Sequence, residues 1–134
     1  MRLKIIIVGL FLIVGIQAFS QNKVKKISAT DFYLMINQSD DCIILDASPV
    51  KYYNRSRIEG AKSIAKSEMI KLALKNVDKE SPIMVYCKYG DRSKVAAPKI
   101  TKMGFKNVYE LKDGLYMWKE KNYPLDKTKK SVKK

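Results

Sequence analysis

Histidine is absent from this chain of 134 residues. Its absence excludes a histidine general base, any catalytic triad that needs histidine, and most catalytic zinc sites. Nucleophilic or acid–base chemistry must therefore come from cysteine, aspartate, glutamate, lysine or tyrosine. Cysteine is also scarce, because only Cys42 and Cys87 are present, and they do not form the Cys-x-x-Cys pair of thiol redox enzymes. We expect neither a bound metal nor a cofactor.

Acidic residues are few, with 13 Asp and Glu against 27 Lys and Arg, which gives a formal net charge of +14. Such an excess raises the question of nucleic-acid binding. The lysines are spread along the chain, however, and no run interleaves basic and aromatic residues, so we expect no nucleic-acid partner. The densest cluster of lysines is at residues 126–134, which we interpret as a basic flexible tail. This tail could increase solubility or make weak contact with an anionic membrane surface.

A hydrophobic run long enough to span a bilayer comfortably is also missing, since Ile5–Ile16 is too short. The run follows Arg2 and Lys4, and Ala18-Phe19-Ser20 places small residues where a signal peptidase reads them. We therefore predict a signal peptide at residues 1–20 and an exported protein, periplasmic or secreted. The alternative is an uncleaved membrane anchor. No cysteine follows the run, which excludes a bacterial lipoprotein anchor.

The rest of the chain is one domain, at residues 24–125, in which strand and helix signals alternate. This alternation predicts an α/β fold with a parallel sheet and helices on its faces. We expect strands at Val24–Ile27, Cys42–Leu45, Ala61–Ala65, Ile83–Tyr86 and Val108–Leu111. We expect helices from a Ser28 and Asp31 capping box to Asn37, at Val50–Tyr53, from a Ser67 cap to Asn76, at Ser93–Met103 and at Leu115–Lys121, with a turn at Asp113-Gly114.

Cys87 occupies the most informative position, because it follows a buried strand and precedes a short loop and a helix. Ligands bind at the carboxyl ends of strands in open parallel sheets. The backbone N–H groups of the loop and of the helix start should point at the sulfur and favour its thiolate. Lys88 and Arg92 add positive charge there. The alternative is an ordinary buried cysteine.

The segment Cys87-Lys88-Tyr89-Gly90-Asp91-Arg92-Ser93 resembles the active-site loop of the rhodanese family. Other matches follow the family order, and together they cover Lys26 to Leu125. They are Leu45-Asp46, Ile58-Glu59-Gly60-Ala61, Ala96-Ala97, Gly104-Phe105-Lys106-Asn107-Val108, Leu111, Gly114, Trp118 and Tyr123-Pro124. The ordered set is specific, although no single match is.

The resemblance implies a central parallel sheet of about five strands and a sulfurtransferase cycle. We expect a monomer. Cys87 would take sulfur from a small anionic donor such as thiosulfate, or from a protein persulfide, and a thiol or other nucleophile would accept it. Lys88, Tyr89, Gly90, Asp91, Arg92 and Ser93 would form the substrate-binding loop. Asp46 would support this loop by accepting its N–H groups or by pairing with Arg92, unless it is simply a solvated strand-end residue.

Two other functions remain open, namely a non-catalytic binding module and an extracytoplasmic thiol relay. A phosphatase is disfavoured, since four residues separate Cys87 from Arg92 and the related cysteine phosphatases have five. We expect no Cys42–Cys87 disulfide, because the two residues should lie at opposite ends of neighbouring strands, roughly 13 Å apart.

The chain departs from the family pattern at several positions. Arg57 replaces a usual His, and Ser48 replaces a common Arg. Asp91 brings negative charge into the loop, and we expect it to point at the helix N–H groups. Pro98 inside the predicted helix suggests that this helix is bent or begins late.

Overall fold

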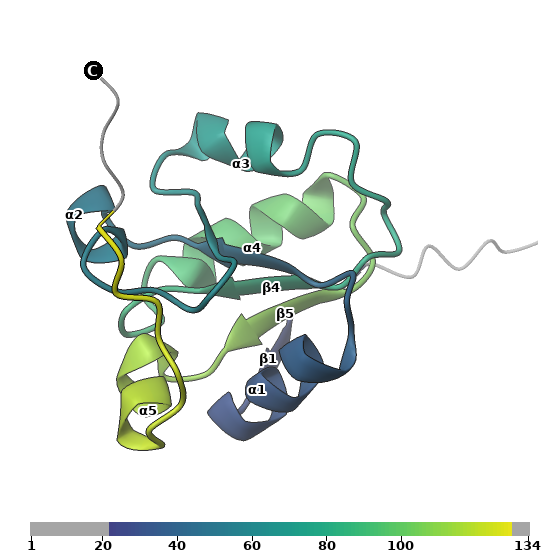
Figure 1. Ribbon diagram of the computed structural model, residues 1–134. Helices are drawn as coiled ribbons and strands as arrows, with labels where there is room; N and C mark the ends of the chain where they lie inside the picture. Colours follow the sequence, from purple (N-terminus) through teal and green to yellow (C-terminus); the bar gives the residue numbers. More distant parts are fainter. Residues whose placement is uncertain (1–21, 130–134) are drawn as a thin grey trace, which may run out of the picture.

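The computed structural model describes residues 22–129 and contains one five-stranded sheet in the order β1-β5-β4-β2-β3 (Figure 1). All four strand pairings are parallel. The strands are β1 (Lys25–Ile27), β2 (Ile43–Asp46), β3 (Lys62–Ser63), β4 (Ile83–Tyr86) and β5 (Val108–Leu111). The predicted α/β fold with a parallel sheet is therefore confirmed.

Helices cover both faces of this sheet (Figure 1). They are α1 (Ala29–Gln38), α2 (Val50–Tyr53), α3 (Ser67–Ala73), α4 (Ser93–Lys102) and α5 (Gly114–Glu120). Apolar residues of α3 and α4 pack on one face of the sheet, and those of α1, α2 and α5 pack on the other. The chain thus has two hydrophobic layers with the sheet between them.

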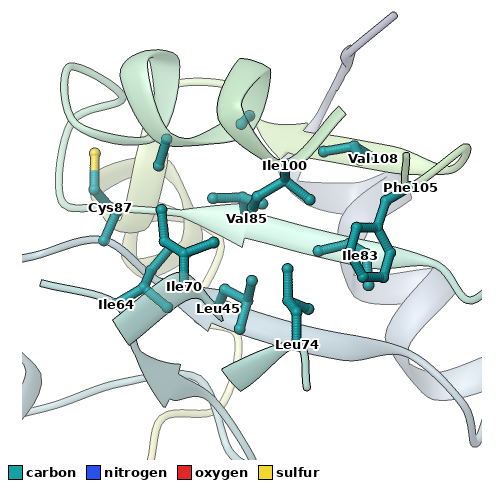
Figure 2. Packing of buried hydrophobic residues seen from close by; sticks show 13 residues of the cluster. Leu45, Ile64, Ile70, Leu74, Ile83, Val85, Cys87, Ile100, Phe105 and Val108 are labelled. Carbon is teal, nitrogen blue, oxygen red and sulfur yellow. The ribbon is translucent and has the colours of Figure 1, made fainter. Parts of the chain in front are cut away.

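Strand β4 lies at the centre of the sheet, and none of its four residues is exposed. Side chains of a strand alternate between the two faces, so Ile83 and Val85 join the α3 and α4 layer while Met84 and Tyr86 join the other layer. Cys87 continues this alternation and belongs to the α3 and α4 layer (Figure 2). The strand register therefore determines the face on which the sulfur lies.

The observed helix ends agree only in part with those predicted from the sequence. Ser28 caps α1, with its hydroxyl oxygen accepting the Asp31 N–H at 3.1 Å. The expected Ser67 cap is wrong, because Lys66 occupies that position and no side chain caps α3. The expected end of this helix at Asn76 is also wrong: α3 ends at Ala73, and Asn76 adopts a φ of 62° that cannot continue a right-handed helix.

Pro98 lies inside α4, which begins at Ser93 as predicted, so the helix does not begin late. The ring of Pro98 is exposed, and the backbone hydrogen bond that proline removes is therefore lost on the solvent side of the helix. The predicted turn at Asp113-Gly114 is only half correct, because Gly114 is already the first residue of α5.

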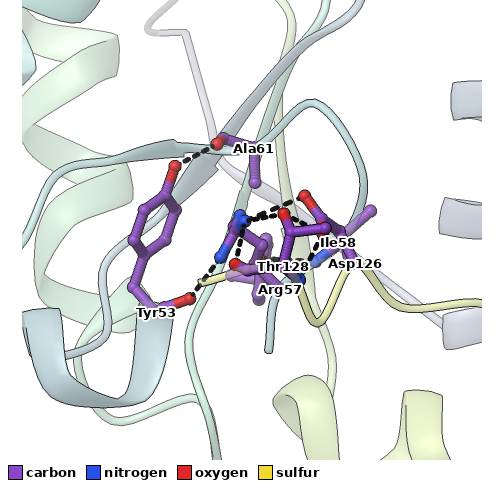
Figure 3. Close-up of polar contacts among 7 residues, drawn as sticks. Tyr53, Arg57, Ile58, Ala61, Asp126 and Thr128 are labelled. Atoms are coloured by element: carbon purple, nitrogen blue, oxygen red, sulfur yellow. Dashed lines mark hydrogen bonds and ion pairs between the residues drawn. The ribbon is translucent and has the colours of Figure 1, made fainter. Parts of the chain in front are cut away.

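The segment after Leu125 is bound to the domain, which corrects the expectation of a flexible tail from residue 126. Arg57 and Asp126 form a two-residue antiparallel bridge, and the buried Arg57 guanidinium pairs with the Asp126 carboxylate at 2.9 Å. The guanidinium also donates to the carbonyl oxygens of Tyr53 and Thr128 (Figure 3). We call these contacts of Arg57 with Tyr53, Asp126 and Thr128 the Arg57 clamp.

Both cysteines are free, as expected, and they lie at opposite ends of the neighbouring strands β2 and β4. The predicted signal peptide and most of the basic tail, residues 130–134, lie outside the described residues. Within residues 22–129, no helix has the length and apolar character needed to cross a membrane.

Candidate active site

Cys87 directly follows β4, and the loop after it folds back over the sulfur. The backbone N–H of Gly90 donates to the Cys87 Sγ at 3.1 Å, and the N–H of Ser93, the first residue of α4, donates at 3.4 Å. Gly90 has a φ of 97°, which a side chain would oppose. The expectation that both the loop and the helix start direct N–H groups at the sulfur is confirmed.

The start of α5 holds the other side of this loop. Leu115 and Tyr116 donate their N–H groups to the carbonyl oxygens of Cys87 and Lys88, at 2.8 and 3.0 Å. Gly114 makes this approach possible, since a Cβ built there would lie 2.5 Å from the Cys87 carbonyl oxygen. The Cys87 and Lys88 carbonyl oxygens therefore accept hydrogen bonds from α5, while the N–H groups of Gly90 and Ser93 remain directed at the sulfur.

A buried carboxylate is linked to the sulfur through the hydroxyl of Ser93, and the sequence did not lead us to expect it. Glu110, a buried residue of β5, accepts a hydrogen bond from the Ser93 hydroxyl at 3.1 Å. The Ser93 oxygen is in turn 3.6 Å from the Cys87 Sγ. The sequence did contain a signal for this contact, namely an acidic residue within the short apolar strand Val108–Leu111. A carboxylate buried in such a strand needs a hydrogen-bonding partner.

Asp91 does not cap α4, contrary to expectation. Its Oδ1 lies 3.6 Å from the Cys87 Sγ, where the thiol can donate to it, and no side chain caps the N-terminus of α4. The physical reason is that the sulfur already occupies the space in front of the Ser93 N–H. Asp91 therefore places its negative charge beside the sulfur.

The basic residues of the loop turn outward. The Lys88 Nζ lies 4.8 Å from the centre of the Tyr52 ring and 5.1 Å from that of Tyr89, which is exposed. Arg92 is exposed and lines a cavity of about 240 Å³ whose apolar wall includes Ile64. Among the predicted loop residues, the structure thus brings Gly90, Asp91 and Ser93 to the sulfur. The side chains of Lys88, Tyr89 and Arg92, which belong to the same loop, make their contacts elsewhere.

Among the described residues, Asp46 neither accepts an N–H group of the loop after Cys87 nor pairs with Arg92, and it is buried rather than a solvated strand-end residue. Its Oδ1 accepts the Ser48 N–H at 2.8 Å, and its buried Oδ2 has no hydrogen-bond partner among the described residues. Burial raises the pKa of Asp46, although hydrogen bonding with Ser48 opposes the shift. The short side chain of Asp46 is occupied by its own loop, the one that follows β2, and therefore orders that loop.

This arrangement can support a sulfur nucleophile. Backbone N–H groups stabilise negative charge on the atom to which they donate, and here two of them share the sulfur of Cys87. Within residues 22–129, no three Cys, Asp or Glu side chains are grouped so that they could hold a metal ion.

The comparison with protein families gives a clear assignment. The model of the rhodanese-like domain matches residues 28–121, which include every strand after β1 and the whole loop around Cys87. The chain therefore belongs to the rhodanese-like domain family.

Curated relatives agree with this assignment. The thiosulfate sulfurtransferase GlpE of Coxiella burnetii is 30% identical over 95 residues, covering 71% of this chain and 87% of GlpE. The adenylyltransferase and sulfurtransferase UBA4 of Meyerozyma guilliermondii is 31% identical over 102 residues, covering 70% of this chain but only 23% of UBA4. These relatives place the chain in a sulfurtransferase family.

Solved structures show the same fold. The Alr3790 protein of Anabaena sp. superimposes with a TM-score of 0.69 at 25% identity, covering 76% of this chain and 80% of that chain. The BH2092 protein of Bacillus halodurans gives a TM-score of 0.68 at 25% identity, covering 78% and 77%. The expected rhodanese-like fold with five parallel strands is thereby confirmed.

Proposed function

We propose that this protein is a rhodanese-type sulfurtransferase that carries sulfur as a persulfide on Cys87. The single observation that carries this proposal is the pair of backbone N–H groups, from Gly90 and Ser93, that point at the Cys87 sulfur. Sγ carries the negative charge when the Cys87 thiolate attacks the donor and again when it leaves the persulfide, and N–H groups held in place by the fold stabilise that charge without reorganising.

The cycle has two displacement steps and needs no external oxidant. In the first, the Cys87 thiolate attacks the outer sulfur of thiosulfate, an S–S bond forms to Cys87, and the S–S bond of the donor breaks to release sulfite. In the second, a nucleophilic acceptor attacks the outer sulfur of the persulfide, and Cys87 leaves as a thiolate. Both steps are displacements at sulfur in which a sulfur atom leaves, so the absence of histidine is no obstacle.

Ser93 supplies a further polar group at the same point. Its hydroxyl now donates to Glu110 and lies 3.6 Å from the Cys87 sulfur. A hydroxyl can rotate to donate to an anion, so Ser93 can also stabilise the persulfide. Asp91 has the opposite effect, because its carboxylate is 3.6 Å from the sulfur and repels an anionic donor.

Intact mass spectrometry after treatment with thiosulfate tests the proposal. We expect one added sulfur on the wild type and on Cys42→Ser, and none on Cys87→Ser. Cyanide should remove the added sulfur and yield thiocyanate. An unchanged mass in the wild type would instead favour a binding module, and mixed disulfides on Cys87 would favour a thiol relay.

A further inference from the structure

Glu110 is a buried carboxylate that the two displacement steps at Cys87 leave unused. It lies on β5 with 4% of its surface exposed, and the Ser93 hydroxyl donates to its Oε1 at 3.1 Å. Neither of the two ion pairs found within residues 22–129 involves Glu110. Burying a charge without a counter-charge costs free energy. Moving the charge of Glu110 to a place with more hydrogen-bond donors would recover part of that cost.

Ser93 connects Glu110 to the sulfur of Cys87. The Ser93 Oγ lies 3.6 Å from the Cys87 Sγ, where the thiol can donate to it, and the Ser93 hydroxyl donates in turn to Glu110. All three side chains lie on one face of the sheet. Strand alternation places Glu110 on the same side as Val108, which belongs with Cys87 to the α3 and α4 layer. A continuous, buried path of hydrogen bonds therefore runs from the sulfur to the carboxylate.

We propose that Glu110 takes up the proton of the Cys87 thiol through the hydroxyl of Ser93. This inference rests on the proposed persulfide function, because sulfur transfer needs the Cys87 thiolate. The proton on Sγ moves to the Ser93 Oγ, while the hydroxyl proton of Ser93 moves to the Glu110 Oε1. No bond between heavy atoms forms or breaks, and neither an oxidant nor a reductant is needed.

The transfer moves one negative charge from Glu110 to the sulfur. The carboxylate gives up a site with one hydrogen-bond donor, the Ser93 hydroxyl. The sulfur then accepts the N–H groups of Gly90 and Ser93 and also the Ser93 hydroxyl, while the neutral Glu110 carboxyl donates to the Ser93 oxygen. The net charge of the site is unchanged, but the charge lies where more donors meet it. Glu110 does not touch the sulfur, so it acts as a positioning residue.

Other titratable groups lie near the two ends of this path. The Asp91 Oδ1 is also 3.6 Å from the Cys87 Sγ, so Asp91 is the rival proton acceptor. In the neighbouring strands, the register partners of Glu110 are Lys26 of β1 and Val85 of β4. Glu110 lines a cavity of about 260 Å³ whose other titratable side chains are all exposed, namely Lys26, Tyr89, Asp91, Lys94, Lys112 and Asp113. Asp91 is therefore the group that the test must separate from Glu110.

The protonation of Cys87 as a function of pH tests the proposal without any sulfur donor. In Cys42→Ser, which leaves Cys87 as the single cysteine, the NMR shift of an isotope-labelled cysteine Cβ distinguishes the thiol from the thiolate. Two groups that share one proton titrate as a pair, with a plateau between two steps, because a proton that moves within the pair is neither gained nor lost. We expect both steps between about pH 5 and about pH 10.

A matched pair of variants identifies the proton acceptor. Glu110→Gln keeps the shape of the side chain but cannot take up a proton, so its addition to Cys42→Ser should remove the lower step and leave a single transition. Asp91→Asn makes the same change in the other carboxylate and should keep both steps. Circular dichroism would check that the variants fold. Two steps in Glu110→Gln, or loss of the lower step in Asp91→Asn instead, would overturn the proposal.

Two changes at Ser93 separate transfer through the hydroxyl from a simple effect of nearby charge. Ser93→Ala removes the hydroxyl and should give a single transition, whereas Ser93→Thr retains a hydroxyl and should keep both steps. Two steps in Ser93→Ala would overturn the proposal, because the two groups would then be coupled through space.

These titrations are separate from the test of the persulfide function, which uses thiosulfate and intact mass. A single transition in Cys42→Ser would overturn the role of Glu110, even if Cys87 were shown to carry sulfur. Two steps that depend on Glu110 and on the Ser93 hydroxyl would support it, even if thiosulfate added no sulfur to Cys87.

Discussion

The two cysteines of this chain flank neighbouring strands and each has a carboxylate nearby, yet the backbone groups that face their sulfur atoms differ. Cys42 precedes β2, and its thiol faces the Met35 carbonyl oxygen at 3.7 Å, where it can only donate. Cys87 follows β4, and its sulfur accepts two backbone N–H groups. The Cys42 sulfur thus faces a hydrogen-bond acceptor of the backbone, whereas the Cys87 sulfur faces two backbone donors.

The difference arises from the direction of the strands. Parallel strands bring their carboxyl ends to the same edge, where the following helices begin and N–H groups are free. At the opposite edge Cys42 meets the C-terminal part of α1, which presents carbonyl oxygens. Burial and the Asp41 carboxylate accordingly raise the pKa of Cys42, although Ser39 opposes the shift. The chemistry of a cysteine therefore depends on the end of the strand at which it stands.

Replacing each cysteine by serine should give the largest contrast. Cys87→Ser should abolish transfer of sulfur from thiosulfate to cyanide, because serine cannot form a persulfide, while Cys42→Ser should retain most of the activity. Circular dichroism would check that both variants fold. Loss of activity in Cys42→Ser alone would reverse the assignment of the site.

The difference between the two cysteines should also decrease when the loop after Cys87 is displaced by Gly114→Ala. The new Cβ would collide with the Cys87 and Lys88 carbonyls at 2.5–2.7 Å, which should lower the free energy of unfolding by about 3 kcal/mol. Gly60→Ala is the control, since Gly60 also has a positive φ, of 80°, but nothing lies within 4 Å of its Cβ position. Denaturant unfolding of both variants would show whether the collision or the backbone strain dominates.

The charge of Asp91 offers a smaller, opposite effect. Asp91→Asn removes the carboxylate that lies 3.6 Å from the Cys87 sulfur, and should raise kcat/KM for thiosulfate roughly three- to tenfold at low salt. Asp41→Asn removes the matching charge near Cys42 and should leave kcat/KM as it is. A decrease in Asp91→Asn would mean that Asp91 serves the reaction in another way, for example as a proton acceptor.

The smallest effect concerns Cys42 itself. Because its folded pKa is raised, its thiolate appears at higher pH than in the unfolded chain, and alkylation by iodoacetamide should be slow near neutral pH. The rate should rise as the pH passes the ordinary range of about 8.5 and should become ordinary in denaturant. Mass spectrometry of Cys87→Ser would follow Cys42 alone. Fast alkylation in the folded state near pH 7 would contradict the raised pKa.

The sequence was informative about features that depend on pattern. The apolar run Ile83–Tyr86 followed by Cys87 predicted the buried strand and the N–H groups at the sulfur, because strand ends and helix starts have fixed geometry. The directions of charged side chains could not be predicted in this way. Glu110 accepts from Ser93, 17 residues away in the chain, which only the fold brings near. Asp46 and Asp91 have partners close in sequence, Ser48 and Cys87, but which of several nearby groups each carboxylate faces depends on the conformation of its loop.

Arg57 illustrates the same limit from another side. In the sequence it was only a substitution for a usual histidine, and nothing nearby in the chain indicated a partner. Its carboxylate partner, Asp126, lies 69 residues away, in a segment whose lysines indicated a flexible tail. Composition describes the average behaviour of a segment, and one long-range pair was enough to make that description wrong for Asp126 and Thr128.

The Arg57 clamp also separates two meanings of a domain boundary. The family match ends at residue 121, but Arg57, which is 1% exposed, obtains its carboxylate and two further oxygens from residues 126 and 128. A chain shortened to the matched region would leave a buried guanidinium without its counter-charge and without the Thr128 oxygens, and it should be less stable than the chain through Lys129. The segment that matches the family is therefore shorter than the segment that the folded domain needs, because only the longer one contains the partners of the buried Arg57 side chain.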